Sequence, residues 1–111
     1  MSLDAWSPDA RGGAVFFDRD ELDLILRLYG RMVAAGEWRD YGIDMLGEAV
    51  SFNVFRRASE APLYRIEKRP ALARRQGAWA VISAAGHVLK RGRELPTLLK
   101  FFDRKRLSVV E

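Results

Sequence analysis

The feature that most constrains the fold of this chain is a change in the period of its apolar residues near residue 40. Before that point, apolar side chains from Leu22 to Val33 repeat at the spacing of one helical face. After it, apolar and polar residues alternate, as in residues 50–55, which is typical of a half-buried strand. A helix followed by short antiparallel strands favours folds in which helices cover one face of a sheet.

The first helix has a clear start and a clear end in the sequence. Asp18 and Glu21 have the spacing of a capping box, in which each side chain accepts a hydrogen bond from the other residue's backbone N–H. Gly36 suits the position after a helix because glycine adopts positive φ without a Cβ clash. A helix over residues 19–35 is therefore predicted. Capping also explains the acidic residues at its start better than a metal site does: Asp18, Asp20, Glu21 and Asp23.

The remaining segments predict strands and a second helix. Strands are expected over residues 50–55, 63–68, 79–84 and 87–91. A further strand is expected over residues 41–46, which Gly42 interrupts and Gly47 ends. Turns are expected at 59–62 and around Ala85-Gly86, with one helical turn at 71–75. Leu95, Leu98, Leu99 and Phe102 predict the second helix, whose first turn suits Pro96. Residues 107–110 read as an edge strand, and residues 14–17 as either a strand or a lid on the core.

These elements predict an α+β domain: an antiparallel sheet of four to five strands with an N-terminal and a C-terminal helix packed on it. Residues 1–13 are polar, contain Ser-Pro and Gly-Gly, and are expected to form a flexible N-terminal arm. Residues 14–111 then form a single globular domain, for which 111 residues with 49% hydrophobic content supply enough core.

Composition excludes several classes of chemistry. The chain has no cysteine and one histidine, which removes disulfides, thiolate chemistry and the common zinc sites. It has no phosphate-binding loop, dinucleotide fingerprint or His-Glu-x-x-His motif. His87 has no neighbouring residue placed to orient it, so a surface or hydrogen-bonded turn histidine is expected. We therefore predict no catalytic residue, metal or cofactor. Without a signal peptide or long apolar run, a cytoplasmic protein without a membrane partner is expected.

Charge is divided unequally along the chain. Residues 1–54 hold five basic and ten acidic residues (5 − 10 = −5), whereas residues 55–111 hold fourteen basic and five acidic ones (14 − 5 = +9). Arginine supplies fifteen of the nineteen basic side chains, and its planar fork of donors matches phosphate and carboxylate. Two interpretations follow: the halves pair with each other in the fold or in a dimer, or the basic half faces an anionic partner.

The candidate anion-binding residues are basic side chains at the ends of the predicted strands and in the loops between them. They are Arg56, Arg57, Arg65, Lys68, Arg69, Arg74, Arg75, Arg91 and Arg93. Trp38 and Tyr41 follow the first helix and carry large amphipathic rings beside charged residues. Such rings either close a core or anchor a partner, so both interpretations stay open.

Four stretches of the chain resemble a small bacterial family that is catalogued only as a domain of unknown function and is found mainly in alphaproteobacteria. They are residues 26–41 (LRLYGRMVAAGEWRDY), 55–60 (FRRASE), 62–68 (PLYRIEK) and 72–77 (LARRQG). The resemblance covers residues 14–106. It implies a single bacterial intracellular domain and adds no catalytic residue.

Three functional hypotheses remain at this point. The first is a small non-enzymatic binding module whose Arg-rich C-terminal half contacts an anionic macromolecule, with nucleic acid as one candidate. The second is a protein-interaction or homodimerising module that does not bind nucleic acid and uses Trp38 and Tyr41 as anchors. The third is an enzyme acting on an anionic small molecule through Arg65, Arg75 and His87, which lacks an activated nucleophile or acid–base pair.

Overall fold

The computed structural model describes the backbone of residues 14–57 and 61–110 and the side chains of residues 14–57 and 61–103. In that part of the chain, two α-helices, one 3₁₀ helix and five strands occur in a simple order. They are α1 (Arg19–Ala34), β1 (Asp40–Met45), β2 (Val50–Phe55), β3 (Tyr64–Lys68), η2 (Pro70–Leu72), β4 (Trp79–Ser83), β5 (Val88–Gly92) and α2 (Leu95–Val110). The predicted arm at 1–13 and most of the predicted turn at 59–62 lie outside the described residues.

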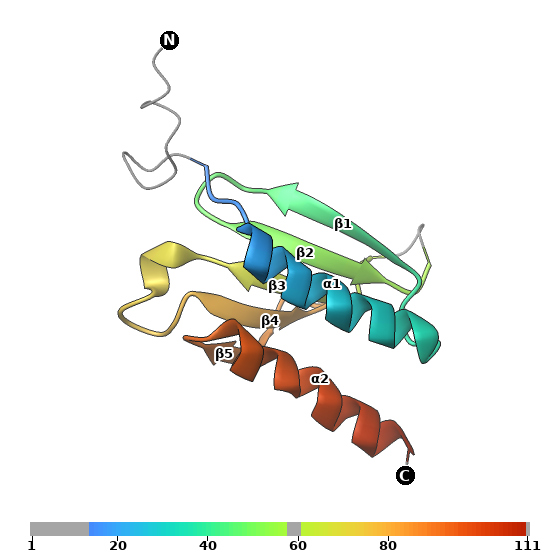
Figure 1. The fold of residues 1–111 in the computed structure, drawn as a ribbon. Helices are drawn as coiled ribbons and strands as arrows, with labels where there is room; N and C mark the ends of the chain where they lie inside the picture. The colour runs from blue at the N-terminus through green and yellow to red at the C-terminus, as the bar shows by residue number, and fades with distance from the viewer. Residues whose placement is uncertain (1–13, 58–60, 111) are drawn as a thin grey trace.

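The strands form one antiparallel sheet in the order β1-β2-β3-β4-β5, so each strand pairs with its neighbour in the sequence. Both helices lie on the same face of this sheet, with α1 and α2 running side by side (Figure 1). The predicted α+β class, with an N-terminal and a C-terminal helix packed on the sheet, is therefore confirmed.

The capping box predicted for α1 is present. Asp18 Oδ1 accepts from the Glu21 N–H and Glu21 Oε1 accepts from the Asp18 N–H, each at 2.8 Å. At the other end, Gly36 adopts φ +79°, as expected of the residue that follows a helix. The backbone N–H groups of Glu37 and Trp38 then donate to the Met32 carbonyl, which turns the chain sharply toward β1.

The structure corrects the prediction for one short segment, residues 107–110, and decides between the two predictions for another, residues 14–17. The strand predicted over residues 107–110 is wrong, because these residues form the last turn of α2. No glycine or proline follows Pro96, so nothing in the local sequence stops the helix. Residues 14–17 form no strand: the Val15 N–H donates to the Gly47 carbonyl, and Phe17 stacks on Trp79 with 6.0 Å between ring centroids. This segment is the lid on the core.

The core lies between the sheet and the two helices. On the helix-facing side, Phe52 of β2, Ile66 of β3 and Val81 of β4 stand opposite one another in register and are fully buried. Ile25 and Leu28 of α1 and Leu98 and Phe102 of α2 belong to the same cluster, as does Trp38. Trp38 meets Phe102 edge-on at 5.1 Å, which joins the connection after α1 to α2.

The opposite face of the sheet carries a small polar network. Ser51 and Asn53 of β2 are 2% and 4% exposed, and Asp44 of β1 lies directly opposite Ser51. The Ser51 hydroxyl donates to Asn53 Oδ1, and Asn53 Nδ2 donates to Asp44 Oδ2, each at 2.9 Å. These bonds satisfy polar groups that would otherwise destabilise the fold by their burial.

Candidate anion-binding site

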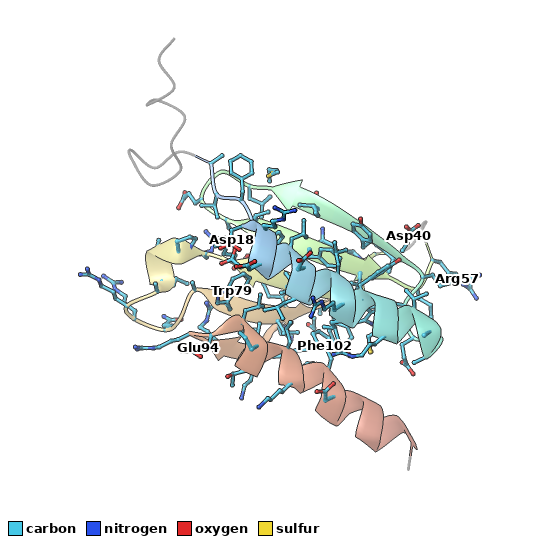
Figure 2. The ribbon with its side chains drawn as sticks, in the orientation of Figure 1. Asp18, Asp40, Arg57, Trp79, Glu94 and Phe102 are labelled. Atoms are coloured by element: carbon cyan, nitrogen blue, oxygen red, sulfur yellow. The ribbon has the colours of Figure 1, made fainter. Side chains whose placement is uncertain are left out.

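A cavity of about 500 Å³ opens at the end of the sheet where α1 finishes. It is lined by Val33, Gly36, Trp38, Arg39, Arg56 and Arg57. These residues come from the end of α1, the connection to β1 and the chain leaving β2. We call this end of the sheet the Arg57 end and the opposite end, where α1 begins, the Asp18 end; both residues are labelled in Figure 2. Three arginines therefore share one concave surface.

The backbone of Arg39 is fixed from both sides. Its N–H donates to the Phe55 carbonyl at 2.8 Å, and its carbonyl accepts from the Tyr29 hydroxyl at 3.0 Å. Burial raises the pKa of Tyr29, and the nearby Asp40 carboxylate and Tyr41 raise it further. The hydroxyl therefore stays protonated and remains a donor well above neutral pH. Arg39 thus projects from an anchored backbone.

Arg56 and Arg57 reach the cavity because of where β2 ends. Side chains alternate between the two faces of a strand, and Phe55, the last residue of β2, pairs with Asp40 on the face opposite the helices. Arg56 is therefore the next residue directed to the helix side, where the end of α1 lies. Both arginines are exposed, whereas Trp38 behind them is 2% exposed and packed on Phe102. The cavity thus has a rigid apolar floor and a charged rim.

The electrostatics of the cavity favour an anion. Among the residues whose side chains are described, no acidic residue lines it and none of its three arginines is in an ion pair. Asp40 lies at the same end of the sheet (Figure 2), and its carboxylate accepts from the Tyr41 N–H. Near the end of α1, the carbonyls of Arg31, Met32 and Val33 accept from backbone N–H groups, so these three do not require a guanidinium.

The structure does not gather the nine predicted anion-binding residues in one place. Arg56 and Arg57 line the cavity, whereas Arg74, Arg75 and Arg93 lie at the Asp18 end, in or beside the loop that holds η2. A five-residue strand separates the two groups by about 15 Å at about 3.3 Å per residue. Arg65 stands opposite Asn53 and so lies on the face of the sheet away from the helices.

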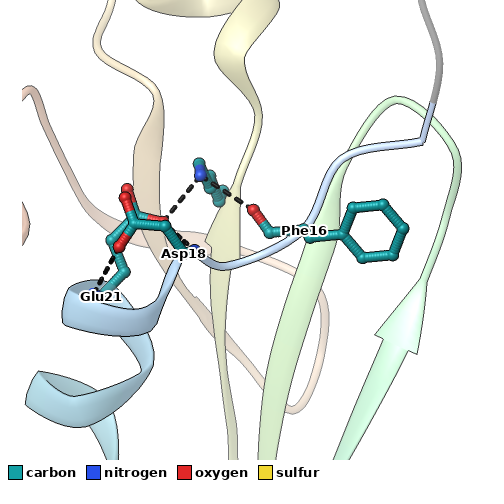
Figure 3. Close-up of polar contacts among 4 residues, drawn as sticks. Phe16, Asp18 and Glu21 are labelled. Carbon is teal, nitrogen blue, oxygen red and sulfur yellow. Dashed lines mark hydrogen bonds and ion pairs between the residues drawn. The ribbon is translucent and has the colours of Figure 1, made fainter. Parts of the chain in front are cut away.

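The other basic candidates bind acceptors within the protein itself. Lys68 Nζ donates to Glu21 Oε1 at 2.7 Å and to the Phe16 carbonyl at 2.9 Å, and Figure 3 shows these contacts around Asp18 and Glu21. Arg69 donates to both carboxylate oxygens of Glu67 at 3.3 and 3.4 Å. Arg91 donates to the Gly77 carbonyl at 3.2 Å. The donors of these three side chains are therefore used within the protein, at the Asp18 end.

Arg39 is the cavity residue that sequence reasoning missed. It lies in the acidic half of the chain, where the charge count draws attention away from single basic residues. The signal in the sequence that could have identified Arg39 is its position directly after Trp38, a ring that was itself a candidate for contact with a partner. Trp38 belongs to the core and also lines the cavity, so its two interpretations are compatible. Tyr41 lies outside the cavity on β1, is 43% exposed, and stacks on Phe52 at 4.7 Å.

Two further features bear on the chemistry of the described residues. His87 is exposed beside the β4–β5 turn, and its backbone N–H donates to the Ser83 hydroxyl at 3.1 Å. Among the residues whose side chains are described, no group of three His, Asp or Glu side chains is placed to hold a metal ion. Neither helix in this part of the chain is long and apolar enough to cross a bilayer.

Comparison with known proteins places the chain in a family and goes no further. No curated protein and no solved structure matches it. A family model with the description "Protein of unknown function (DUF2794)" matches residues 15–99, which include α1, all five strands and the first turns of α2. All three cavity arginines fall inside this match. The chain therefore belongs to the DUF2794 family of proteins of unknown function.

Proposed function

We propose that this protein is a non-enzymatic binding module that holds an anionic group of a partner in the cavity formed by Arg39, Arg56 and Arg57. The observation that carries this proposal is the convergence of three arginines on one cavity; among the described side chains none of them has an ion-pair partner and no acidic residue lines the cavity. Lys68, Arg69 and Arg91, in contrast, donate to acceptors within the protein.

The chemistry of the cavity suits a phosphate group. Each guanidinium offers a planar fork of donors that matches two oxygens of a phosphate, and it stays charged at any physiological pH. A volume of about 500 Å³ is within the range of small-molecule sites and exceeds what one phosphate fills. The site therefore suits a phosphate that is attached to a larger group, with the apolar floor at Trp38 beneath it.

Nucleic acid is the partner that we place first. Its backbone carries a phosphate at every nucleotide, and arginine contacts to phosphates need no particular base sequence. Three arginine contacts predict a slope of about −2 in log affinity against log salt on single strands and about −3 on duplex DNA. A bacterial, cytoplasmic setting, where such partners are plentiful, stays a prediction from the sequence.

The decisive comparison uses two Arg-Arg pairs in the same chain. R56A/R57A removes two cavity arginines, and R74A/R75A removes an exposed pair at the opposite end of the sheet with the same change in net charge. Fluorescence anisotropy with a 5′-phosphorylated single-stranded oligonucleotide is measured over a salt series. We expect R56A/R57A to weaken binding by more than about tenfold and R74A/R75A by less than about twofold.

Two results would overturn the proposal. Equal losses in the two double variants would show that binding follows net charge and not the cavity. No binding by the unmodified protein at low salt would remove nucleic acid as the partner, and a calorimetric titration with pyrophosphate then tests the cavity alone. A cavity that binds neither ligand does not have the proposed function.

The alternative, a protein-interaction or homodimerising module, stays a prediction. The exposed ring of Tyr41 is the observation that favours it, because large aromatic side chains anchor many protein interfaces. Sedimentation over a wide concentration range distinguishes a dimer from a monomer.

A further inference from the structure

The edge strand β1 carries a row of exposed apolar side chains. Tyr41, Ile43 and Met45 alternate along it and face the helix side of the sheet, with exposed fractions of 43%, 38% and 56%. Leu46, directly after the strand, is 53% exposed. Phe52, Ile66 and Val81 on the helix side of the inner strands β2, β3 and β4 are fully buried, whereas the described residues leave the apolar row of β1 partly uncovered. A continuous apolar row of this kind is typical of an interaction surface.

The outer edge of β1 also has backbone groups available for pairing. In the described part of the chain β1 pairs with β2 alone, through all six of its residues. The other side of an edge strand presents N–H and C=O groups that form a template for another strand. Recognition by strand addition takes its affinity from these backbone bonds and its specificity from alternate side chains.

The side chains on the other face of β1 are acidic and held in place. Asp40 and Asp44 lie on the face away from the helices, with Gly42 between them. The Asp44 carboxylate accepts from Asn53, which is itself 4% exposed, and the Asp40 carboxylate accepts from the Tyr41 N–H. Neither carboxylate has an ion-pair partner among the described side chains. An added strand would therefore meet two fixed negative charges.

These charges disfavour a second copy of β1 as the added strand. In a symmetric antiparallel pair, residues that face each other lie on the same side of the sheet. Pairing centred on Gly42 sets Asp40 opposite Asp44 of the second copy, and pairing centred on Ile43 sets the Asp44 side chains diagonally across from each other. Like charges in these positions destabilise a strand pair.

We propose that β1 is a docking edge for an extended segment of another protein, in which apolar residues alternate with lysine or arginine. The backbone of the segment pairs with β1 as an added strand. Its apolar side chains cover Tyr41, Ile43 and Met45, and its basic side chains meet Asp40 and Asp44. This site is independent of the arginine cavity, since it uses the opposite charge and none of the residues that line the cavity.

The test uses two designed peptides and calorimetric titration with the full chain at low salt. One peptide alternates lysine with valine or isoleucine, and the control peptide replaces every lysine with glutamate. We expect the basic peptide to bind and the acidic one not to. Amide hydrogen exchange should slow along β1 when the basic peptide is present, because strand addition protects backbone N–H groups.

Two variants in β1 and two controls localise the effect. Asp44→Lys should lower the affinity for the basic peptide by about threefold to tenfold, since it converts a cross-strand attraction into a repulsion. Met45→Ser disrupts the apolar row without a change of charge and without touching the Asn53 contact; it should also weaken binding of the basic peptide, so it keeps the test valid if Asp44→Lys unfolds. Asp23→Lys makes the same charge change on the exposed side of α1 and should alter the affinity by less than about twofold. R56A/R57A should also leave peptide binding within about twofold, which separates this proposal from the cavity.

Three outcomes would overturn the docking proposal. Absence of binding by the basic peptide removes it, and so does equal weakening by Asp23→Lys and Asp44→Lys. Concentration-dependent self-association that protects the β1 amides without any peptide would show that the occupant is a second copy of this chain.

Discussion

The two ends of the sheet use the same residue types for different purposes. At the Asp18 end, Lys68 and Arg69 are bound by Glu21 and Glu67, and Lys68 also donates to the backbone of the lid segment. At the Arg57 end, Arg39, Arg56 and Arg57 have no such partners among the described side chains. A basic residue is therefore available to a ligand only where the fold leaves its donors unused.

Lys68 and the cavity arginines also differ in their burial. The Lys68 and Glu21 side chains are 18% and 22% exposed, so loss of one leaves the other partly desolvated. Arg56 and Arg57 are exposed, and water replaces whatever contact they lose. Substitution of Lys68 should therefore change stability, whereas substitution of Arg56 or Arg57 should change binding.

The largest expected effect comes from the glycine that closes the loop at the Asp18 end. Gly77 has φ +101°, and a Cβ there would lie 2.3 Å from the Gly92 carbonyl oxygen. Gly77→Ala should lower the free energy of unfolding by about 3 kcal/mol or more, because backbone strain adds to a clash with backbone. Urea unfolding measures the loss. Gly86→Ala is the control, since Gly86 has φ +92° with nothing near its Cβ position, and it should lose only about 1–2 kcal/mol. Equal losses would contradict the close approach at Gly77.

The second effect compares one lysine with one arginine. Lys68→Met keeps the length of the side chain and removes its charge-assisted bonds to Glu21 and to the Phe16 carbonyl. The free energy of unfolding should fall by about 2 kcal/mol, whereas Arg57→Met should change it by less than about 0.5 kcal/mol. Thermal unfolding of the two variants and of the unmodified protein measures these losses of stability. A larger loss for Arg57→Met would reverse the comparison of the two ends.

The third effect concerns Arg39, the cavity residue with the anchored backbone. Arg39→Gln should weaken pyrophosphate binding by about tenfold, because one charge-assisted set of hydrogen bonds is lost. Its stability should stay close to that of the unmodified protein. Arg31→Gln is the matched control, because Arg31 is exposed on α1 and its nearest carboxylate, Asp103, is 4.0 Å away. Calorimetric titration in which Arg31→Gln weakens binding as much as Arg39→Gln would argue against the cavity.

The smallest expected effect tests how the Arg57 end is held. Tyr29→Phe removes the hydroxyl that donates to the Arg39 carbonyl and should lower the free energy of unfolding by about 0.5–1.5 kcal/mol. Because the pKa of Tyr29 is raised in the folded protein, its contribution is complete below the unfolded pKa near 10.0 and is lost as pH rises through the folded pKa. The advantage of the unmodified protein over Tyr29→Phe should therefore shrink as the pH rises above 10.0. An advantage that grows over this range would contradict the raised pKa.

Much of the fold was predictable because its signals are local. The capping box of Asp18 and Glu21 and the positive φ of Gly36 depend on residues a few positions apart, and both are present as expected. Alternation identified β2 and β3 for the same reason. Residues 107–110 were misassigned because four apolar and polar residues fit either a strand or the end of a helix, and continuity with α2 decides between them.

The candidate site was only partly predictable because it depends on contacts between distant segments. Arg56 and Arg57 were identified from their charge, but nothing near Arg39 in the sequence shows that β1 pairing brings it beside them. Lys68 looked equivalent to these arginines in the sequence, and only the packing of α1 places Glu21 against it. Charge is readable from sequence, whereas the presence of an internal partner is a property of the folded chain.

The most direct test of the account is a nuclear magnetic resonance titration of the isotope-labelled protein with pyrophosphate. Backbone amide shifts are followed for the residues of the Arg57 end and for Lys68, Arg74, Arg75 and Arg93 at the other end. The account predicts saturable shifts at Gly36, Arg39, Arg56 and Arg57, with the Asp18 end unchanged. Shifts centred on Arg74, Arg75 and Arg93, or spread evenly over both ends, would contradict it.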